Sequence, residues 1–303
     1  MPSDERLEYL TLLAEQYPTI QALCTEIINL KAILNLPKGT EHFISDLHGE
    51  YEAFFHILNN CSGVIREKSQ ALFQGEIDDR ELNDLLTLIY YPEEKLQRLH
   101  EQGQITVAWY RLRLHQLIRL NRLLSSKYTR SKVRKAIPPA YAYILDELLH
   151  AQPDEDNNQL TYHQKIIETL IQIGSGDEFI LSLCALIKRL AVDRLHIIGD
   201  IFDRGPRADS ILELLLHYHA VDVEWGNHDI LWMGAACGND ACIAGVICNC
   251  LRYGNMEILE RGYAISLRPL SLFAQQQYPQ LPLETAQHHA MTVILFKLEG
   301  QLI

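Results

Sequence analysis

Three short stretches of the sequence carry residue types that together could bind metal ions and phosphate. In chain order they are residues 43–49 (FISDLHG), 199–206 (GDIFDRGP) and 221–229 (VDVEWGNHD). Their carboxylates, imidazoles and amide offer mixed oxygen and nitrogen ligands, which suit Mn²⁺, Fe, Zn²⁺ or Mg²⁺. A pair of such metals can activate water and neutralise a phosphate ester, so the pattern predicts a two-metal phosphate hydrolase.

Four residues are the candidate metal ligands. Asp46 and His48 are separated by one residue, so a carboxylate and an imidazole can point at one cation. Asp200 is the natural bridge, because the two oxygens of a carboxylate can hold two metals ~3.5–4 Å apart. Asn227 would add a neutral carbonyl oxygen, which does not repel a phosphate.

The remaining polar residues suit the hydrolytic step. The guanidinium of Arg204 can hold a phosphate through two hydrogen bonds, which a lysine cannot. His228 could protonate the leaving alkoxide, with Asp203 or Asp229 holding its ring. We therefore expect Asp203, Arg204 and His228 to be catalytic, Asp229 to support them, and Arg204, Asn227 and His228 to contact the substrate phosphate.

Each motif alone has an ordinary structural interpretation. Asp-x-His is common, Asp-Arg-Gly is a frequent turn, and Asn-His-Asp could cap a helix. What favours the functional interpretation is that all three occur together, each after a predicted strand.

The elements that must position these residues are strands. Residues 41–45 and the apolar run 195–198 read as buried strands, and 210–218 reads as an amphipathic helix. Open α/β sheets bind ligands at the carboxyl ends of their strands, so an α/β fold is predicted. Other segments with helical spacing are 3–35, 50–60, most of 64–192, 228–237, 240–251, 255–261 and 284–303, the last with a strand as the alternative.

Composition limits the class of protein. The net charge of −12 over 303 residues argues against nucleic acid or anionic membranes as partners. The sequence lacks a run of ~18 apolar residues and a secretory signal pattern, so a cytoplasmic location is expected. This charge and composition are compatible with a homo-oligomer. Four of the seven cysteines fall between 237 and 250, but without paired C-x2-C spacing, so core thiols are expected rather than zinc ligands.

One segment runs against the acidic average. Residues 111–135 contain nine Lys or Arg and no Asp or Glu. Arg119, Arg122 and Arg130 are the candidate residues of an anion site there. The alternative is a solvated helix face.

The three motifs, D-x-H, G-D-x-x-D-R-G and G-N-H-D, resemble the signature of the calcineurin-like metallophosphoesterases. The middle motif is similar to that of serine/threonine protein phosphatases. Asp46 and Asp200 are 154 positions apart, with a helical insertion between them, and this layout resembles a class III fructose-1,6-bisphosphatase over essentially the whole chain. The resemblance implies a partial calcineurin-like β-sandwich with flanking helices, in which 64–192 is the insertion.

The resemblance also implies a function. Such an enzyme uses Mn²⁺ to remove the 1-phosphate of fructose 1,6-bisphosphate, giving fructose 6-phosphate in gluconeogenesis. By matching motifs, the four candidate ligands named above would bind metal and Arg204 would hold the phosphate. His228 would be the general acid, supported by Asp203.

The chain departs from that family in length. The family's members are about twice as long, and their later half supplies two more histidine ligands, the last in a Gly-His-x-His motif that this sequence lacks. Residues 1–303 are therefore expected to form the N-terminal part of a metallophosphoesterase domain. The missing C-terminal half, or a complementing chain, would be a partner, and the chain alone should bind metal weakly and show little activity. The alternatives are a protein or nucleotide phosphatase, or a non-catalytic module that binds an anionic partner.

Overall fold

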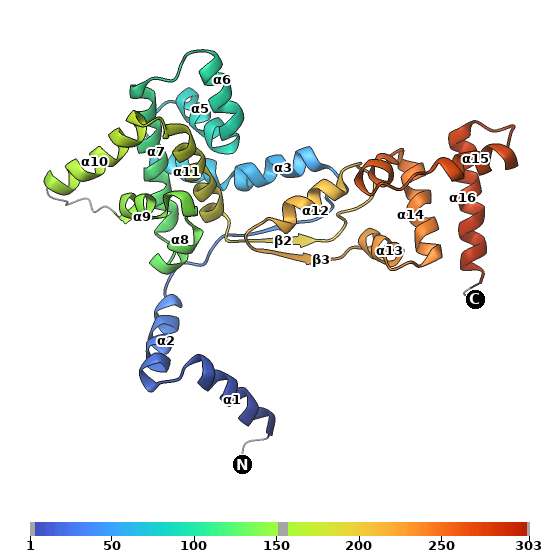
Figure 1. Cartoon of the computed structure of the whole chain (residues 1–303), viewed down its shortest axis with the longest axis horizontal. Helices are drawn as coiled ribbons and strands as arrows, with labels where there is room; N and C mark the ends of the chain where they lie inside the picture. The colour runs from blue at the N-terminus through green and yellow to red at the C-terminus, as the bar shows by residue number, and fades with distance from the viewer. Residues whose placement is uncertain (1–3, 151–156, 302–303) are drawn as a thin grey trace.

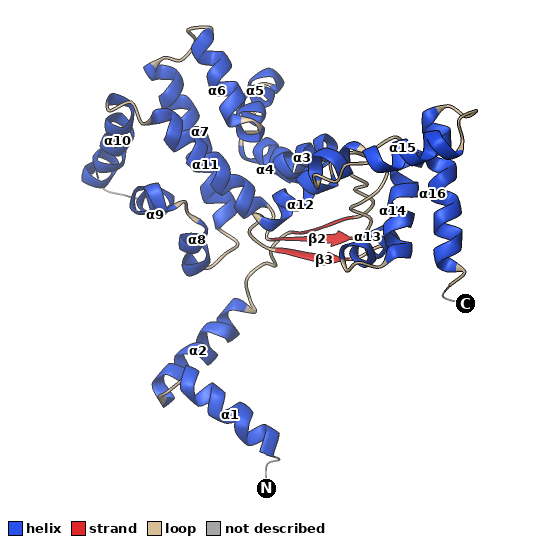
Figure 2. Cartoon of the chain, turned by 45° about the vertical axis from the view of Figure 1, so that its right-hand side comes forward, coloured by secondary structure: helices blue, strands red, loops and turns tan. Residues whose placement is uncertain are grey.

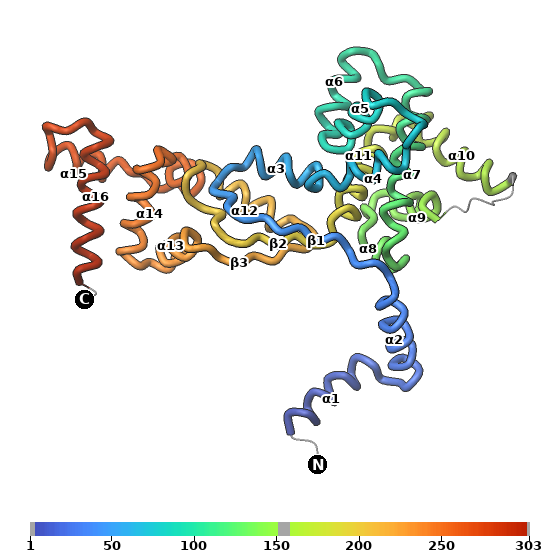
Figure 3. The backbone as a smooth tube through the Cα atoms, turned by 180° about the vertical axis from the view of Figure 1, so that it is seen from behind, coloured from blue at the N-terminus to red at the C-terminus, as the bar shows by residue number. Residues whose placement is uncertain are grey.

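The computed structural model of the chain describes residues 4–150 and 157–301. A small sheet lies at the centre, with a group of helices beyond the amino ends of its strands and a second group beyond their carboxyl ends (Figure 1). Two N-terminal helices extend away from the rest of the molecule, as the view from behind also shows (Figure 3).

Three short parallel strands form the sheet in the order β1-β2-β3. They are β1 (Glu41–Ile44), β2 (Arg194–Ile198) and β3 (Val221–Glu224). Leu195 and Ile197 on the central strand are fully buried, as expected for a strand paired on both sides. The predicted α/β class is confirmed, although helices dominate the chain (Figure 2).

One face of the sheet is covered by α3 (Tyr51–Asn60) and α12 (Ala208–Leu216). Their side chains Phe54, Ile211 and Leu215 share one buried cluster with Leu195 and Ile197. These contacts fix the helices that follow the first two strands, and with them the loops between strand and helix.

No described element covers the opposite face of the sheet. Phe43 and His196 stack there with ring centroids 4.4 Å apart, and Phe43 and Ile198 are exposed. Parallel sheets are usually covered on both faces, so an uncovered face is unusual for this kind of sheet.

Residues 64–192 are mostly helical, as predicted, except that 151–156 lie outside the described residues. Whether they form an insertion within a larger domain stays a prediction. Their buried side chains form a separate core of their own. The helices are α4 (Val64–Leu72), α5 (Asp79–Tyr90), α6 (Pro92–Glu101), α7 (Val107–Ser125), α8 (Arg130–Ala136), α9 (Ala142–His150), α10 (Asn157–Gln172) and α11 (Gly176–Ala191).

A buried guanidinium ties α5 to α7. Arg113 is 6% exposed and donates to Asp84 Oδ2 at 2.7 Å and to Gln116 Oε1 at 2.8 Å. Asp84 also pairs with Lys95 of α6. A charge this buried depends on its partners, because an unpaired ion away from water is costly.

We expect Asp84→Asn to destabilise the chain by about 2 kcal/mol, because Arg113 and Lys95 lose their shared counter-charge while Glu81 remains near Arg113. Urea denaturation measures the change. Lys165→Gln, which breaks an exposed pair with Glu168, should change stability by less than ~1 kcal/mol. Equal effects of the two substitutions would contradict this account.

The sequence predicted one helix over residues 3–35, and this prediction is wrong, because the structure has two helices there. Residue 3 lies outside the described residues. They are α1 (Asp4–Gln16) and α2 (Ile20–Ile33). Pro18 cannot continue a helix hydrogen-bond ladder, and the Thr19 side chain accepts from the Ala22 amide at 3.1 Å, which begins a new helix. Neither helix has a buried residue.

The second helical group follows the sheet. Its elements are α13 (Asn227–Ala236), α14 (Asp240–Tyr253), a π-helical turn (Ile258–Gly262), α15 (Arg268–Gln277) and α16 (Leu283–Glu299). The helix interpretation of 284–303 is therefore confirmed over its described part, and the strand alternative is wrong. The predicted helix 255–261 is mostly this π-helical turn.

The core-thiol prediction holds for part of the cysteine cluster. Cys248 and Cys250 are buried, Cys242 is half-buried and Cys237 is exposed. Cys237 is exposed because it lies at the end of α13 rather than inside a helix. Over 4–150 and 157–301, no cysteine joins a group of side chains placed to hold a metal ion.

Within the same ranges, no single helix combines the length and apolar character needed to cross a membrane. One pair, α10 with α11, meets the length and composition criteria jointly, but is bent by 119°.

Candidate active site

The loops after β1 and β2 are joined through their backbones. The His48 amide donates to Asp200 O at 2.8 Å, and the Gly49 amide to Ile201 O at 2.8 Å. The Gly205 amide returns to His48 O at 2.6 Å. The first two sequence motifs are therefore one structural unit, despite the long helical segment between them.

This close approach requires glycine at two positions. Gly49 has a φ of +72°, and a Cβ there would lie 2.3 Å from Gly205 O. A Cβ on Gly205 would lie 2.6 Å from His48 O. Any larger residue would force the two loops apart.

Asp229 organises the loop that carries Asp200. Its carboxylate accepts from the amides of Asp200 at 2.7 Å, Ile201 at 2.9 Å and Phe202 at 3.2 Å, and from Gly226 at 2.9 Å. Asp229 itself is buried. Its oxygens are therefore used by the backbone, and Asp229 does not hold the ring of His228.

We expect Asp229→Asn to destabilise the chain by about 2–6 kcal/mol. The amide has one acceptor oxygen, so two of the four N–H groups would face its NH₂ group, at about 1–3 kcal/mol for each unpaired buried donor. Chemical denaturation measures the loss. Glu299→Gln, which neutralises an exposed carboxylate at the end of α16, should change stability by less than ~0.5 kcal/mol. A loss no larger than that of the control would rule out the anchoring role.

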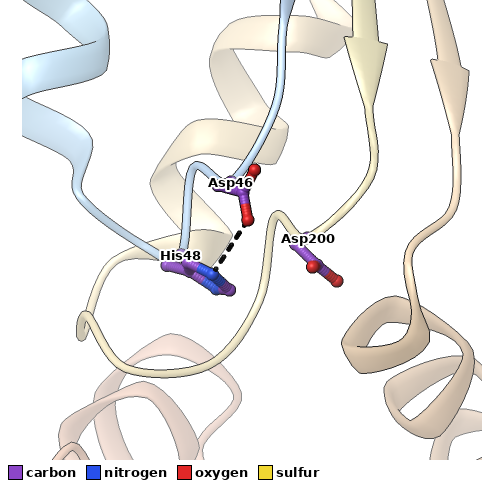
Figure 4. Close-up of side chains that lie close together, drawn as sticks. All are labelled: Asp46, His48 and Asp200. Atoms are coloured by element: carbon purple, nitrogen blue, oxygen red, sulfur yellow. Dashed lines mark ion pairs between the residues drawn. The ribbon is translucent and has the colours of Figure 1, made fainter.

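Asp46, His48 and Asp200 come together at the carboxyl ends of β1 and β2 (Figure 4). One ligand atom from each lies within 4.8 Å of the others, and His48 Nε2 is 3.6 Å from Asp46 Oδ1. The Nδ1–H of His48 donates to Phe202 O at 3.1 Å, which leaves Nε2 for a cation. A Cβ on Gly226 would lie 2.1 Å from Asp200 Oδ1, so the cradle around that carboxylate needs glycine. Two carboxylates and one imidazole fit a divalent metal such as Mn²⁺.

The backbone is strained where these residues lie. Five residues other than glycine have a positive φ in this region: Asp46, His48, Asp200, Asp203 and Arg204. Such conformations cost about 1–3 kcal/mol each and are concentrated at functional sites in proteins. The hydrogen bonds between the loops and those of Asp229 hold them in place.

His228 has the carboxylate partner that a general acid needs. Its Nδ1 lies 2.5 Å from Asp203 Oδ2, and its ring packs edge-on against His48 with centroids 5.4 Å apart. The Asp203 side chain is fully buried. It also accepts from Trp232 Nε1 at 3.0 Å and Asn249 Nδ2 at 2.9 Å. Of the two partners considered for His228, the structure selects Asp203.

Trp232 and Asn249 were missed by the sequence analysis. Trp232 is four residues after His228, hence on the same face of α13, and this spacing could have revealed it. Asn249 lies among apolar residues of α14, and only the fold brings it to Asp203.

The side chains of Asn227 and Arg204 are exposed. The backbone of α13 begins beside the cluster, because the His228 amide donates to Asp200 Oδ1 at 3.3 Å. The contacts expected from Asn227 to metal and from Arg204 to phosphate stay predictions.

The predicted anion site lies on α7 and α8, and two of its three residues make hydrogen bonds within the helical segment. Arg119 makes two hydrogen bonds to Glu76, at 2.6 and 2.7 Å. Arg122 donates twice to Leu148 O, at 2.8 and 2.6 Å, while Arg130 is the first residue of α8. The contacts of Arg119 and Arg122 favour a structural role within the helical segment over an anion site.

Comparison with known proteins places this site in context. Residues 8–303 match the family described as Firmicute fructose-1,6-bisphosphatase. A class 3 fructose-1,6-bisphosphatase of Clostridium beijerinckii is 52% identical over 99% of this chain and 48% of its own length. Proteins of the same name from Listeria monocytogenes and Parabacteroides distasonis are each 51% identical over 98% of this chain and 48% of theirs. The chain thus spans about half the length of these curated relatives. No solved structure matches.

Proposed function

The chain belongs to the Firmicute fructose-1,6-bisphosphatase family, and from this premise we propose that it provides metal and proton-transfer residues for hydrolysis of the 1-phosphate of fructose 1,6-bisphosphate. One observation carries the proposal. The donors Asp46, His48 and Asp200 lie together beside a histidine that a buried carboxylate orients. The reaction would yield fructose 6-phosphate and serve gluconeogenesis in the cytoplasm.

Asp46, His48 and Asp200 would hold the metal, with Asn227 as a fourth ligand. When bound, a divalent ion such as Mn²⁺ would supply Lewis-acid activation of water and of the phosphate. The chain's own contribution to metal binding would be the rigidity of the two loops that carry the donors. The loops carrying the donors are joined to each other through backbone hydrogen bonds, so little reorganisation would accompany metal binding.

His228 would supply the proton for the leaving sugar oxygen. With Nδ1 engaged by Asp203, Nε2 is the nitrogen that can carry this proton, and the buried carboxylate favours the orientation that presents it. The Arg204 guanidinium, next to Asp203 in sequence, would hold two phosphate oxygens. Asn227 and His228 would contact the same phosphate.

The proposal extends to the fold. The open face of the sheet supports a calcineurin-like β-sandwich of which residues 1–303 are the N-terminal part and 64–192 an insertion. The half of the relatives that this chain does not match would then complete the sandwich and supply the remaining metal ligands.

Phosphate release is the test. The chain joined to the unmatched half of the Clostridium beijerinckii relative should hydrolyse fructose 1,6-bisphosphate when Mn²⁺ is added, and Asp200→Asn should abolish the activity. The 303-residue chain alone should release little phosphate. Preference for a phosphopeptide or a nucleotide over the sugar bisphosphate would contradict the assigned substrate, and Mn²⁺-independent hydrolysis would contradict the mechanism.

A further inference from the structure

An apolar groove of about 580 Å³ lies beside the candidate active site. It runs from the end of β3 across α13 and α14 to the segment after the π-helical turn. Among the residues that line it, Asp229 is the only charged one. Its outer part is formed by Val223, Trp225, Met233, Tyr263 and Ile265.

These outer residues are unusually exposed for their types. Trp225 is 65% exposed and Met233 is 49% exposed. Contiguous apolar surface on a folded chain marks an interaction site, and tryptophan, tyrosine and methionine are the residues enriched at the buried centres of protein interfaces. The groove therefore has the composition of a docking surface for another polypeptide.

The adjoining strand has a free side. β3 pairs only with β2 in the three-stranded sheet of the described ranges, and Asp222, Val223 and Glu224 are exposed. An edge strand offers unpaired N–H and C=O groups on which an incoming strand can pair. Because Val223 belongs to both β3 and the groove, one partner can pair with the edge and fill the groove together.

We propose that the groove and the free edge of β3 dock the polypeptide that corresponds to the unmatched half of the relatives. This chain covers 48% of the Clostridium beijerinckii relative, so that protein carries a second portion of similar size, which has no counterpart in the described structure. That portion would add a strand to β3 and place apolar side chains between Trp225 and Met233.

A second copy of this chain fits the surface poorly. Two β3 edges paired about a twofold axis would bring the exposed Glu224 of each copy toward the acidic edge of the other, in a chain with a net charge of −12. Like charges across paired strands are destabilising. The unmatched half carries no such symmetry requirement.

Docking at this surface would cover residues that position the site. Trp232, which lines the groove, donates to the buried Asp203 carboxylate at 3.0 Å. Asp229, also in the lining, holds the Asp200 loop. An occupied groove would therefore exclude water from the hydrogen bonds that orient His228 and Asp200.

The test uses the 303-residue chain and, as probe, a polypeptide comprising the unmatched half of the Clostridium beijerinckii relative. Peroxide oxidation of Met233, read by mass spectrometry, should slow at least ten-fold when the probe is added. Amide hydrogen exchange over Val221–Glu224 should slow as well. Trp225→Asp should weaken binding at least ten-fold, whereas Leu34→Asp, at an 83% exposed apolar position just after α2, should leave it unchanged.

Three results would overturn the proposal. One is probe binding that leaves Met233 equally reactive, and another is equal weakening by both substitutions. The third is protection of Met233 in the chain alone as its concentration rises, which would identify a second copy as the occupant. If the free probe is unfolded by circular dichroism, the two halves are joined in one polypeptide. In this joined protein Met233 should be oxidised more slowly than in the 303-residue chain, and equal oxidation rates would contradict the proposal. None of these measurements depends on phosphatase activity, so the docking and the proposed function can fail separately.

Discussion

Gly226→Ala is expected to lower the Mn²⁺ affinity of the chain by about 10–100-fold, the range seen when the surroundings of a metal ligand are altered. The new Cβ would lie 2.1 Å from Asp200 Oδ1 and 2.6 Å from the Asp200 backbone nitrogen. Neither atom can yield easily, because Asp229 holds the Asp200 amide at 2.7 Å. The carboxylate must therefore leave the position in which it faces Asp46 and His48.

Isothermal titration calorimetry with Mn²⁺ measures the effect, and thermal denaturation shows whether the variant is folded. Gly300→Ala is the matched control. Gly300 lies at the end of α16, its φ is −64°, and the nearest atom to an added Cβ is Phe296 O at 3.2 Å. Unchanged Mn²⁺ affinity in a folded Gly226→Ala chain would show that Asp200 is not a metal ligand.

Asp203→Asn is expected to reduce the rate of sugar phosphate hydrolysis by about 10²–10⁴-fold in the protein joined to its unmatched half, which is the usual contribution of a positioned general acid. The Asp203 side chain is fully buried against His228, so it would act through His228 as a positioning residue. The asparagine would keep one acceptor oxygen for the three donors of His228, Trp232 and Asn249, and its own NH₂ group would face a donor instead of accepting from it.

A purely structural role would slow every substrate equally. Loss of proton donation should instead spare p-nitrophenyl phosphate, whose leaving group needs no proton. His228→Gln should show the same dependence on the leaving group, because both substitutions remove one proton transfer. A uniform rate loss across leaving groups in both variants would refute the assignment of His228 as the general acid.

Local sequence signals were enough to place β1 and β2 and to indicate three strand ends at which the site lies. The apolar run 195–198 indicates β2, and Asp200 follows just after the strand end. The spacing of Asp46 and His48 is also a local signal, because the single residue between them lets both side chains face the same side of a tight loop. These features depend on apolar runs and on the spacing of the polar residues that follow them, and both can be recognised in a single sequence.

What the sequence left open depends on long-range contacts. Asp203 and Asp229 were equivalent candidates beside His228 until the fold gave Asp229 four backbone amides. Arg119 is part of a basic run in the sequence, but Glu76, 43 positions away, accepts its two hydrogen bonds. The positive φ values of Asp46, His48 and Asp200 occur at residues other than glycine, so the sequence does not mark them.

The two largest buried clusters of residues 4–150 and 157–301 are separate: the helical segment has its own cluster, and the sheet with α3 and α12 has a smaller one. Local opening of a protein follows such cooperative units. The amides of β2 should therefore exchange with solvent while those of α7 and α11 are still protected, so the strand ends that carry Asp46 and Asp200 can come apart in a molecule that circular dichroism would report as folded. For this chain, helical signal and an assembled metal site are separate properties.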